Sequence, residues 1–199
     1  GRLVIFENQK GQFLNVRQIA EHPGEAKKER IKKTFPWVSA VLAALNILVF
    51  LIVESRGDSM DGNYMFDCGA MWYPAVLEDH EYYRVFTSTF LHFGIEHLLN
   101  NMISLLLFGR MIEYHIGRVK FAVLYLGSGI FAGIASLLYH VKIERLAVSA
   151  GASGAIFGLI GAMLMLVIVN RGKLNGISLK QMLFLSALNL MVGFMTENV

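Results

Sequence analysis

The sequence predicts an all-α, polytopic membrane protein, a bundle of helices that cross the bilayer several times. Three observations support this fold class: the composition, the number of long apolar stretches and the distribution of basic residues. Hydrophobic residues make up 55% of the 199 residues and charged residues 17%, which is more apolar and less charged than an ordinary soluble domain. A soluble bundle of buried helices is the alternative, but the sequence holds too little polar surface to cover so large a core.

Five apolar stretches are candidates for membrane-spanning helices. They cover residues 37–53, 91–112, 121–139, 146–169 and 179–195. The first, third and fourth approach the ~20 apolar residues that a spanning helix requires. The second and fifth contain polar side chains, which lower their hydropathy, but helices that line a functional site within a membrane bundle often carry such groups. We therefore expect five spans.

The distribution of basic residues indicates that the N-terminus is cytoplasmic. The segment KKERIKK at residues 27–33 places five Lys or Arg residues directly before the first span. Alternating spans then place eleven basic residues near the inner ends of the helices and four near the outer ends, in agreement with the positive-inside rule. We expect no nucleic-acid partner, because no basic face is interleaved with aromatic residues. The compact loops and the charge bias favour a bacterial plasma membrane.

The chain divides at its first span into an N-terminal cytoplasmic segment, residues 1–33, and a transmembrane domain, residues 34–199. In the first segment, two short β-prone runs flank the turn-like NQKGQ, which predicts either a hairpin or the remnant of a small domain. The longest outer connection, residues 54–90, is rich in aromatic residues and glycine. We expect this connection to be structured and to lie against the bilayer interface.

One serine stands among small residues at the outer mouth of the fourth span. In SAGASGAIFGLIGAM, Ser153 lies between Gly151 and Gly154. Glycines let a backbone or a substrate approach closely, and a helix that begins here directs free N–H groups at developing negative charge. A serine nucleophile needs such stabilisation of the oxyanion, together with a base that removes its proton. The alternative is a packing helix, since Gly154, Gly158 and Gly161 follow small-residue spacing.

Two polar residues of the second span lie at the same expected depth as this serine. His97 and Asn101 are four residues apart and therefore share a helix face. A histidine and an amide within lipid are unfavourable unless they find partners or line a water-filled cavity. Both lie in the outer half of a span that runs inward, as Ser153 does in the fourth span. Each alone is a candidate for hydrogen bonding between helices, but together they suggest a site with one nucleophile and two oxyanion donors.

Four stretches of the sequence, in their order and spacing, resemble the rhomboid intramembrane serine proteases. They are YYRVFTSTFLHFGIEHLLNNM, FGRMIEYHIGRVKF, the Gly129/Gly133 pattern of the third span and GASGAIFG, and the resemblance covers about residues 35–199. It implies a rhomboid-like core of six helices, of which five are present here. It also implies a serine endopeptidase that cleaves transmembrane segments of membrane proteins through a Ser-His dyad.

The resemblance assigns roles to single residues. Ser153 of the G-x-S-G element corresponds to the nucleophile. His97 and Asn101 of the H-x-x-x-N element correspond to the groups that help hold the oxyanion beside the Ser153 backbone N–H. The pair Tyr83-Arg84 resembles the W-R element of the outer connection, which implies a structural role in a loop that leans into the outer leaflet.

Two departures from the family pattern affect the site. Phe157 stands where a tyrosine is frequent, so its ring can stack on a catalytic histidine but cannot donate a hydrogen bond. The family's general base is a histidine on a sixth span, and this sequence has no histidine after His140. Its last residues, TENV, resemble the approach to that span, so we expect a chain that is truncated before the base and inactive by itself. We expect no metal or other cofactor, since the acidic residues of the outer connection match no metal-binding loop.

The remaining histidines and one acidic residue have expected structural or solvated positions. We expect His92 to lie near the surface, more than one helical turn from the site. We expect Glu113, with Gly117 close by, to make a structural hydrogen bond at the inner end of the second span. A solvated surface role is expected at four further positions: His22, His80, His115 and His140.

Two functions from different classes remain open. One is the intramembrane protease, whose partners are transmembrane protein substrates and the lipid bilayer. The other is a non-catalytic rhomboid-like protein that binds transmembrane helices and controls their trafficking or degradation. An Ala-His pair followed by small residues beyond Val199 separates the first from the second. A small transporter is less well supported, because no inverted repeat or pair of broken helices is evident.

Overall fold

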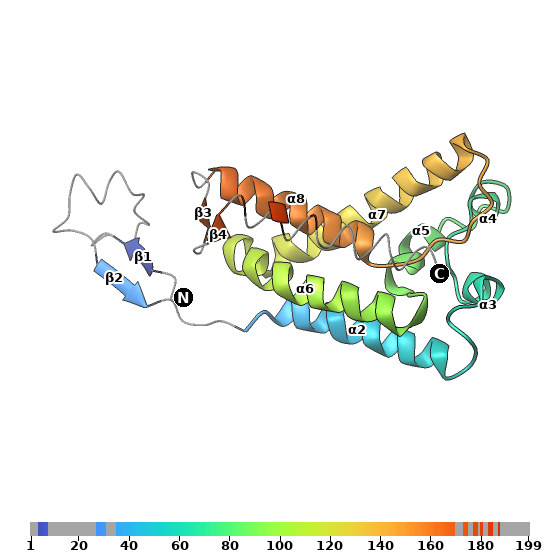
Figure 1. Cartoon of the computed structure of the whole chain (residues 1–199), viewed down its shortest axis with the longest axis horizontal. Helices are drawn as coiled ribbons and strands as arrows, with labels where there is room; N and C mark the ends of the chain where they lie inside the picture. The colour runs from blue at the N-terminus through green and yellow to red at the C-terminus, as the bar shows by residue number, and fades with distance from the viewer. Residues whose placement is uncertain are drawn as a thin grey trace.

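The protein is built around four long helices: α2 (Trp37–Glu54), α6 (Gly94–Ile116), α7 (Arg118–Lys142) and α8 (Ser153–Val169). The computed structural model describes residues 4–7, 27–30, 35–169, 173–174, 177–178, 180, 183–184 and 187. Figure 1 shows α6 lying between α2 and α8, and α7 packs against α8. The predicted helical bundle is therefore confirmed. The fifth predicted span, 179–195, lies largely outside the described residues.

Short elements occupy the connections. Four of them lie between α2 and α6, namely α3 (Gly62–Asp67), α4 (Tyr73–Leu77), α5 (Arg84–Thr87) and the 3-10 helix η1 (Ser88–Phe90). Two small antiparallel pairs lie near the ends of the chain, β1 (Val4–Glu7) with β2 (Lys27–Arg30) and β3 (Lys173–Leu174) with β4 (Ile177–Ser178).

The strand β1 pairs with a segment that is distant in the sequence. Val4 lies opposite Arg30 and Glu7 opposite Lys27, so one partner of β1 is the basic segment before α2. The turn-like NQKGQ and the β-prone run after it lie outside the described residues, so the predicted hairpin stays a prediction.

The lengths and surfaces of the helices suit a bilayer. α2 and α7 are long and apolar enough to cross a membrane, with mean hydropathies of 2.2 and 2.0, and α8 is a shorter apolar helix of 17 residues. Large apolar side chains remain exposed on the outward faces, including Leu51 at 58%, Phe131 at 75% and Val119 at 78%. Water disfavours an apolar surface of this extent, whereas lipid accommodates it.

Glycines bring α8 close to α7. A Cβ atom at Gly154 would overlap the Ala132 side chain, and one at Gly158 would overlap Ser128. The predicted packing at Gly158 is confirmed, and Gly154 also serves it. At Gly161 nothing lies within 4 Å of an added Cβ among the described residues. The fifth predicted span lies largely outside those residues, so packing at Gly161 stays a prediction.

The Glu113 carboxylate joins α6 to the start of α2. It accepts hydrogen bonds from the backbone N–H of Val38 (3.0 Å), the backbone N–H of Ser39 (2.9 Å) and the Ser39 hydroxyl (2.7 Å). These N–H groups belong to the first turn of α2 and have no partner within the helix, and a negative charge at a helix N-terminus is favourable. The structural role expected for Glu113 is confirmed. Gly117, with φ of +83°, forms the turn from α6 into α7.

Arg84 fixes the shape of the outer connection. Its guanidinium donates hydrogen bonds to the carbonyl oxygens of Phe66 and Ala70 and to the Glu81 carboxylate, and it lies 3.8 Å from the centre of the Phe66 ring. The side chain is buried although it is charged, so these partners replace the water that it loses. The expectation that residues 54–90 are structured is confirmed. Contact of the neighbouring Tyr83 with the outer leaflet stays a prediction.

The connection before α8 is tied to the outer connection. Met71 and Ser149 exchange two backbone hydrogen bonds of 2.9 and 2.7 Å, and the Gly151 N–H donates to the Ser88 carbonyl at 2.9 Å. The Gly151 bond holds the chain before Ser153 against η1, and the Ser149 bonds hold it against the segment between α3 and α4. The start of α8 is thus positioned by elements that are distant in sequence.

Candidate active site

Ser153 is the first residue of α8, and its side chain is half-buried. The backbone N–H groups in the first turn of a helix have no partner within the helix, so this end of α8 carries partial positive charge. Ser153 therefore combines a hydroxyl group with free N–H donors at one point of the fold. The predicted position of this serine at a helix start is confirmed.

Gly151 lies close to both Ser153 and His97. A Cβ atom added to Gly151 would lie 2.8 Å from His97 Cε1, 2.9 Å from His97 Nε2 and 3.6 Å from Ser153 Oγ. The φ angle of Gly151 is +137°, a conformation that side-chain-bearing residues rarely adopt. Glycine is therefore required here both by the backbone and by the space that the His97 ring occupies. The structure brings the predicted nucleophile and one predicted oxyanion donor to the same glycine.

Asn101 lies one turn after His97 on α6. Its Nδ2 donates a hydrogen bond to the His97 carbonyl at 2.9 Å, and the residue is 3% exposed. An amide nitrogen carries two hydrogens, so one remains for another acceptor. The structure confirms that His97 and Asn101 neighbour each other on one helix, but it shows no contact between Asn101 and Ser153.

His92 belongs to the site, which the sequence interpretation missed. It lies in the connection before α6, is only 1% exposed, and packs edge to face against His97 with a centroid distance of 5.3 Å. Its Nε2 accepts a hydrogen bond of 3.4 Å from the Ala152 N–H. A ring nitrogen that accepts a hydrogen bond carries no proton, so Nε2 of His92 is unprotonated in this arrangement.

The expectation that His92 lies near the surface is wrong. Counting turns back from His97 assumes that the helix continues, whereas α6 begins at Gly94 and the chain before it folds inward. The one signal in the sequence is the short separation of the two histidines: His92 lies five residues before His97, outside the helix.

No described histidine hydrogen-bonds to the Ser153 hydroxyl. His80 contacts the Tyr82 hydroxyl at 3.0 Å, His115 donates to the Met111 carbonyl at 2.7 Å, and His140 lies 3.5 Å from the Ser149 hydroxyl. His80 is exposed, as expected, but His115 and His140 are partly buried and hydrogen-bonded, so a purely solvated role is wrong for these two. His22 lies outside the described residues.

The other residues expected to shape the site have different surroundings. Phe157, one turn after Ser153, is 42% exposed and makes no ring contact with a histidine in the part of the chain that the structure describes. Gly154 faces Ala132 of α7. Thus Gly151 shapes the space between the reactive groups, whereas Gly154 sets the distance between helices.

The arrangement has the parts that acyl transfer requires, apart from a base. It offers a hydroxyl nucleophile, N–H groups that have no partner within the helix and a buried imidazole close by, and the chain before Ser153 is held by the hydrogen bond from Gly151 to η1. A strong nucleophile still needs a group that accepts the serine proton. That group is absent from the described residues around Ser153.

Known proteins are similar in sequence to this chain over much of its length. The Rhomboid domain family model matches residues 79–199. The chain is 32% identical over 164 residues to "Rhomboid protease GluP" of Bacillus subtilis (strain 168), an alignment that covers 82% of this chain and 31% of the relative. It is 38% identical over 131 residues to "RHOMBOID-like protein 1" of Arabidopsis thaliana, covering 64% of this chain and 32% of the relative.

A further relative is named as an inactive protein. "Inactive RHOMBOID-like protein 8" of Arabidopsis thaliana is 36% identical over 129 residues, covering 64% of this chain and 36% of the relative. The chain thus spans about a third of the length of these three proteins. Because the family model matches well over half of the chain and the helices form the bundle described above, the chain belongs to the rhomboid family of integral membrane proteins.

Proposed function

We propose that this rhomboid protein is an intramembrane serine endopeptidase that cleaves transmembrane segments of other membrane proteins. The observation that carries the proposal is that His97 and Ser153 both lie beside Gly151, around the position that a Cβ atom of this residue would occupy. A scissile carbonyl bound beside Gly151 is then close to both the serine hydroxyl and an imidazole donor. The similarity to a relative named as a rhomboid protease supports the same activity.

In the proposed mechanism, Ser153 Oγ attacks the carbonyl carbon and forms a tetrahedral intermediate. The free N–H groups at the start of α8, the His97 imidazole and the second Asn101 hydrogen stabilise the oxyanion. Donors that are already oriented stabilise developing charge without reorganising, and one such donor typically contributes about 10²–10³-fold to kcat. Collapse of the intermediate breaks the peptide bond and leaves an acyl-enzyme that water hydrolyses.

The proton of Ser153 goes to a base outside the described residues. We propose a histidine from a sixth membrane span, as the sequence resemblance implies. It accepts the Oγ proton during attack and transfers it to the leaving amine. His92 does not take this role in the proposal, because its Nε2 is occupied by the Ala152 N–H. We also propose that residues 1–199 alone are inactive.

The proposed orientation places the N-terminus in the cytoplasm and Ser153 near the outer surface. The KKERIKK segment precedes α2, and the positive-inside rule favours the cytoplasmic side for such a segment. Water for hydrolysis then reaches Ser153 from outside, and a substrate helix has to unwind locally to present its carbonyl.

The test is cleavage of a transmembrane substrate by the full-length natural protein in lipid vesicles. We expect site-specific cleavage by the wild type and none above background by Ser153→Ala. Ser149→Ala is the matched control, since Ser149 is a nearby hydroxyl tied to Met71 through its backbone. Equal cleavage by wild type and Ser153→Ala contradicts the proposal.

A second candidate is a non-catalytic protein that binds transmembrane helices and controls their trafficking or degradation. Two observations favour it: a relative of similar identity is named inactive, and no described histidine contacts the Ser153 hydroxyl. In this case the full-length protein captures a transmembrane helix with equal affinity as wild type and as Ser153→Ala, and it cleaves nothing. Absence of an Ala-His pair downstream of Val199 in the natural sequence favours this candidate over the protease.

A further inference from the structure

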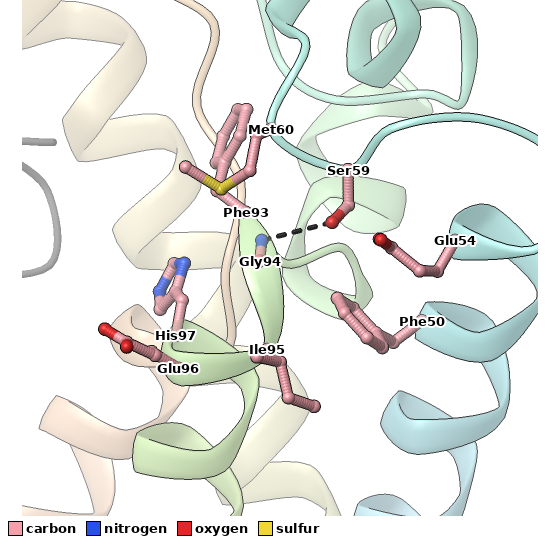
Figure 2. A pocket seen from close by; sticks show the side chains of 9 residues that line it. All are labelled: Phe50, Glu54, Ser59, Met60, Phe93, Gly94, Ile95, Glu96 and His97. Carbon is pink, nitrogen blue, oxygen red and sulfur yellow. Dashed lines mark hydrogen bonds between the residues drawn. The ribbon is translucent and has the colours of Figure 1, made fainter.

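A cavity of about 540 Å³ opens beside the candidate active site, between the outer end of α2 and the first turn of α6. Phe50, Met60 and Phe93 give it an apolar lining, and Glu54 and Glu96 give it two carboxylates. Figure 2 shows Glu54 extending from the end of α2, whereas Glu96 and His97 come from the first turn of α6. The cavity therefore combines an apolar wall with negative charge.

Neither Glu54 nor Glu96 forms an ion pair within the part of the chain that the structure describes, where Arg84 with Glu81 is the pair found. Both side chains are exposed, so they remain hydrated. Since Glu54, Glu96 and His97 do not form a metal-binding group among the described residues, the charge is better suited to an organic cation than to a metal ion.

His97 connects this cavity to the reactive serine. Its residue is 8% exposed, it lines the cavity, and its ring also abuts Gly151 on the side of Ser153. Among the described residues the ring packs against His92, and it forms part of the wall of the cavity. A peptide bound at Ser153 can therefore place a neighbouring side chain in the cavity, because successive residues of an extended chain advance ~3.3–3.6 Å.

The entrance of the cavity is held in a fixed shape. The buried Ser59 hydroxyl accepts a hydrogen bond of 3.2 Å from the Gly94 N–H, which Figure 2 shows as a dashed line. Gly94 has φ of +71°, and a Cβ there would lie 2.8 Å from Met60 Sδ. The loop after α2 is thereby clamped to the start of α6, so the cavity is formed before anything binds.

We propose that this cavity binds a lysine or arginine side chain of the substrate, located within a few residues of the scissile bond. The aliphatic part of such a side chain packs against Phe50, Met60 and Phe93. Its cationic end meets Glu54, which extends toward the cavity in Figure 2, while Glu96 adds negative charge at the wall on the side of His97. The inference rests on the proposed proteolytic function and adds to it a preference for substrates with a basic residue beside the cleavage site.

Glu96 has a competing structural role that the test must separate. An acidic residue in the first turn of a helix stabilises that helix through its dipole, so Glu96→Gln can weaken α6 without any effect on a substrate. A structural effect lowers cleavage of all substrates alike. A specificity effect changes the ratio between a basic substrate and its neutral counterpart, and this ratio is the quantity to measure.

The experiment uses the full-length protein in phosphatidylcholine vesicles and pairs of transmembrane substrates that differ only in Lys or Gln at one position. The substituted position is moved one residue at a time along both sides of the cleavage site. We expect the Lys substrate to have about fivefold higher kcat/KM at one or two positions, the upper range for a solvent-exposed ion pair. The advantage disappears in the Glu54→Gln/Glu96→Gln double variant and persists in Glu78→Gln, which removes an exposed carboxylate outside the cavity.

Binding separates failure of this inference from failure of the proposed function. Fluorescent peptides of the Lys and Gln series are titrated against Ser153→Ala, which cannot cleave. Tighter binding of Lys peptides that depends on Glu54 and Glu96 supports the inference even where the wild type cleaves nothing. Equal binding of both series, or a Lys preference that survives the double variant, overturns it. The preference is also expected to weaken as salt is raised, because the charges are exposed.

Discussion

Gly151 provides the most demanding test of the site geometry. Its φ of +137° and its position against the His97 ring both exclude a side chain. We predict that Gly151→Ala, a change of one methyl group, strongly impairs both the stability and the proposed peptidase activity. The effect follows from two separate causes, which can be measured separately.

The first cause is the backbone. A residue with a Cβ in a sparsely populated conformation is destabilised by about 1–3 kcal/mol. The second is the contact with His97. The added Cβ would lie 2.8–2.9 Å from two ring atoms, whereas carbon atoms in contact are ~3.5–4.0 Å apart, so the ring must move by roughly 1 Å. A displacement of about 1 Å in a catalytic group can lower the rate by about 10²-fold.

The assay measures kcat/KM of the full-length protein for a transmembrane substrate together with its unfolding in detergent. Gly161→Ala, within α8, is the matched control, because no atom of the described residues lies within 4 Å of a Cβ at that position. We expect kcat/KM of Gly151→Ala to fall by about 10²-fold, while Gly161→Ala retains wild-type values.

A double variant keeps the prediction testable if Gly151→Ala folds poorly. Gly151→Ala/His97→Ala removes the ring that the new methyl group meets, so part of the lost unfolding free energy returns, while the backbone cost remains. Wild-type kcat/KM and stability in Gly151→Ala contradict the placement of His97 against Gly151. Strict additivity of the two substitutions in unfolding free energy contradicts their contact.

Three further predictions concern neighbouring contacts. Glu113→Ala removes the acceptor of three hydrogen bonds at the start of α2. We expect it to lower the unfolding free energy by about 2 kcal/mol, with Glu78→Ala as the control, and an unchanged unfolding free energy argues against the capping role. His92→Phe keeps a ring but removes the acceptor of the Ala152 N–H, so kcat is expected to fall more than KM changes, and kinetics equal to wild type exclude a role in positioning. Asn101→Ala is expected to lower kcat by about 10²–10³-fold if its amide donates to the oxyanion, and retention of the wild-type kcat assigns it to helix structure alone.

The sequence predicts the parts of this fold that depend on local composition. The apolar stretches correspond to α2, α7 and α8, and the polar second stretch to α6, because hydropathy and helix periodicity are properties of neighbouring residues. His97 and Asn101 share a helix face for the same reason. A structural hydrogen bond of Glu113 was also predictable, although its partners were not, since a carboxylate within a membrane helix requires a partner.

Other features depend on contacts that sequence order does not specify. The pairing of β1 with Lys27–Arg30 and the burial of His92 under α8 both join segments that are far apart in the chain. Gly158 and Gly161 match the same packing pattern, but among the described residues a Cβ meets a neighbour at Gly158 and none at Gly161, because a crossing angle is set by two whole helices. The acidic cavity between α2 and α6 likewise arises only when Glu54 and Glu96, 42 positions apart, are brought to one place.

The central claim is that Ser153 is an activated nucleophile, and covalent labelling tests it most directly. A fluorophosphonate reacts with an activated serine by forming an Oγ–P bond and releasing fluoride, and mass spectrometry identifies the labelled residue. For the folded full-length protein in lipid vesicles, we predict a single label on Ser153 that is absent from Ser153→Ala and from heat-denatured protein. Label on Ser149 or another serine, or no label on a protein that cleaves its substrate, contradicts the claim.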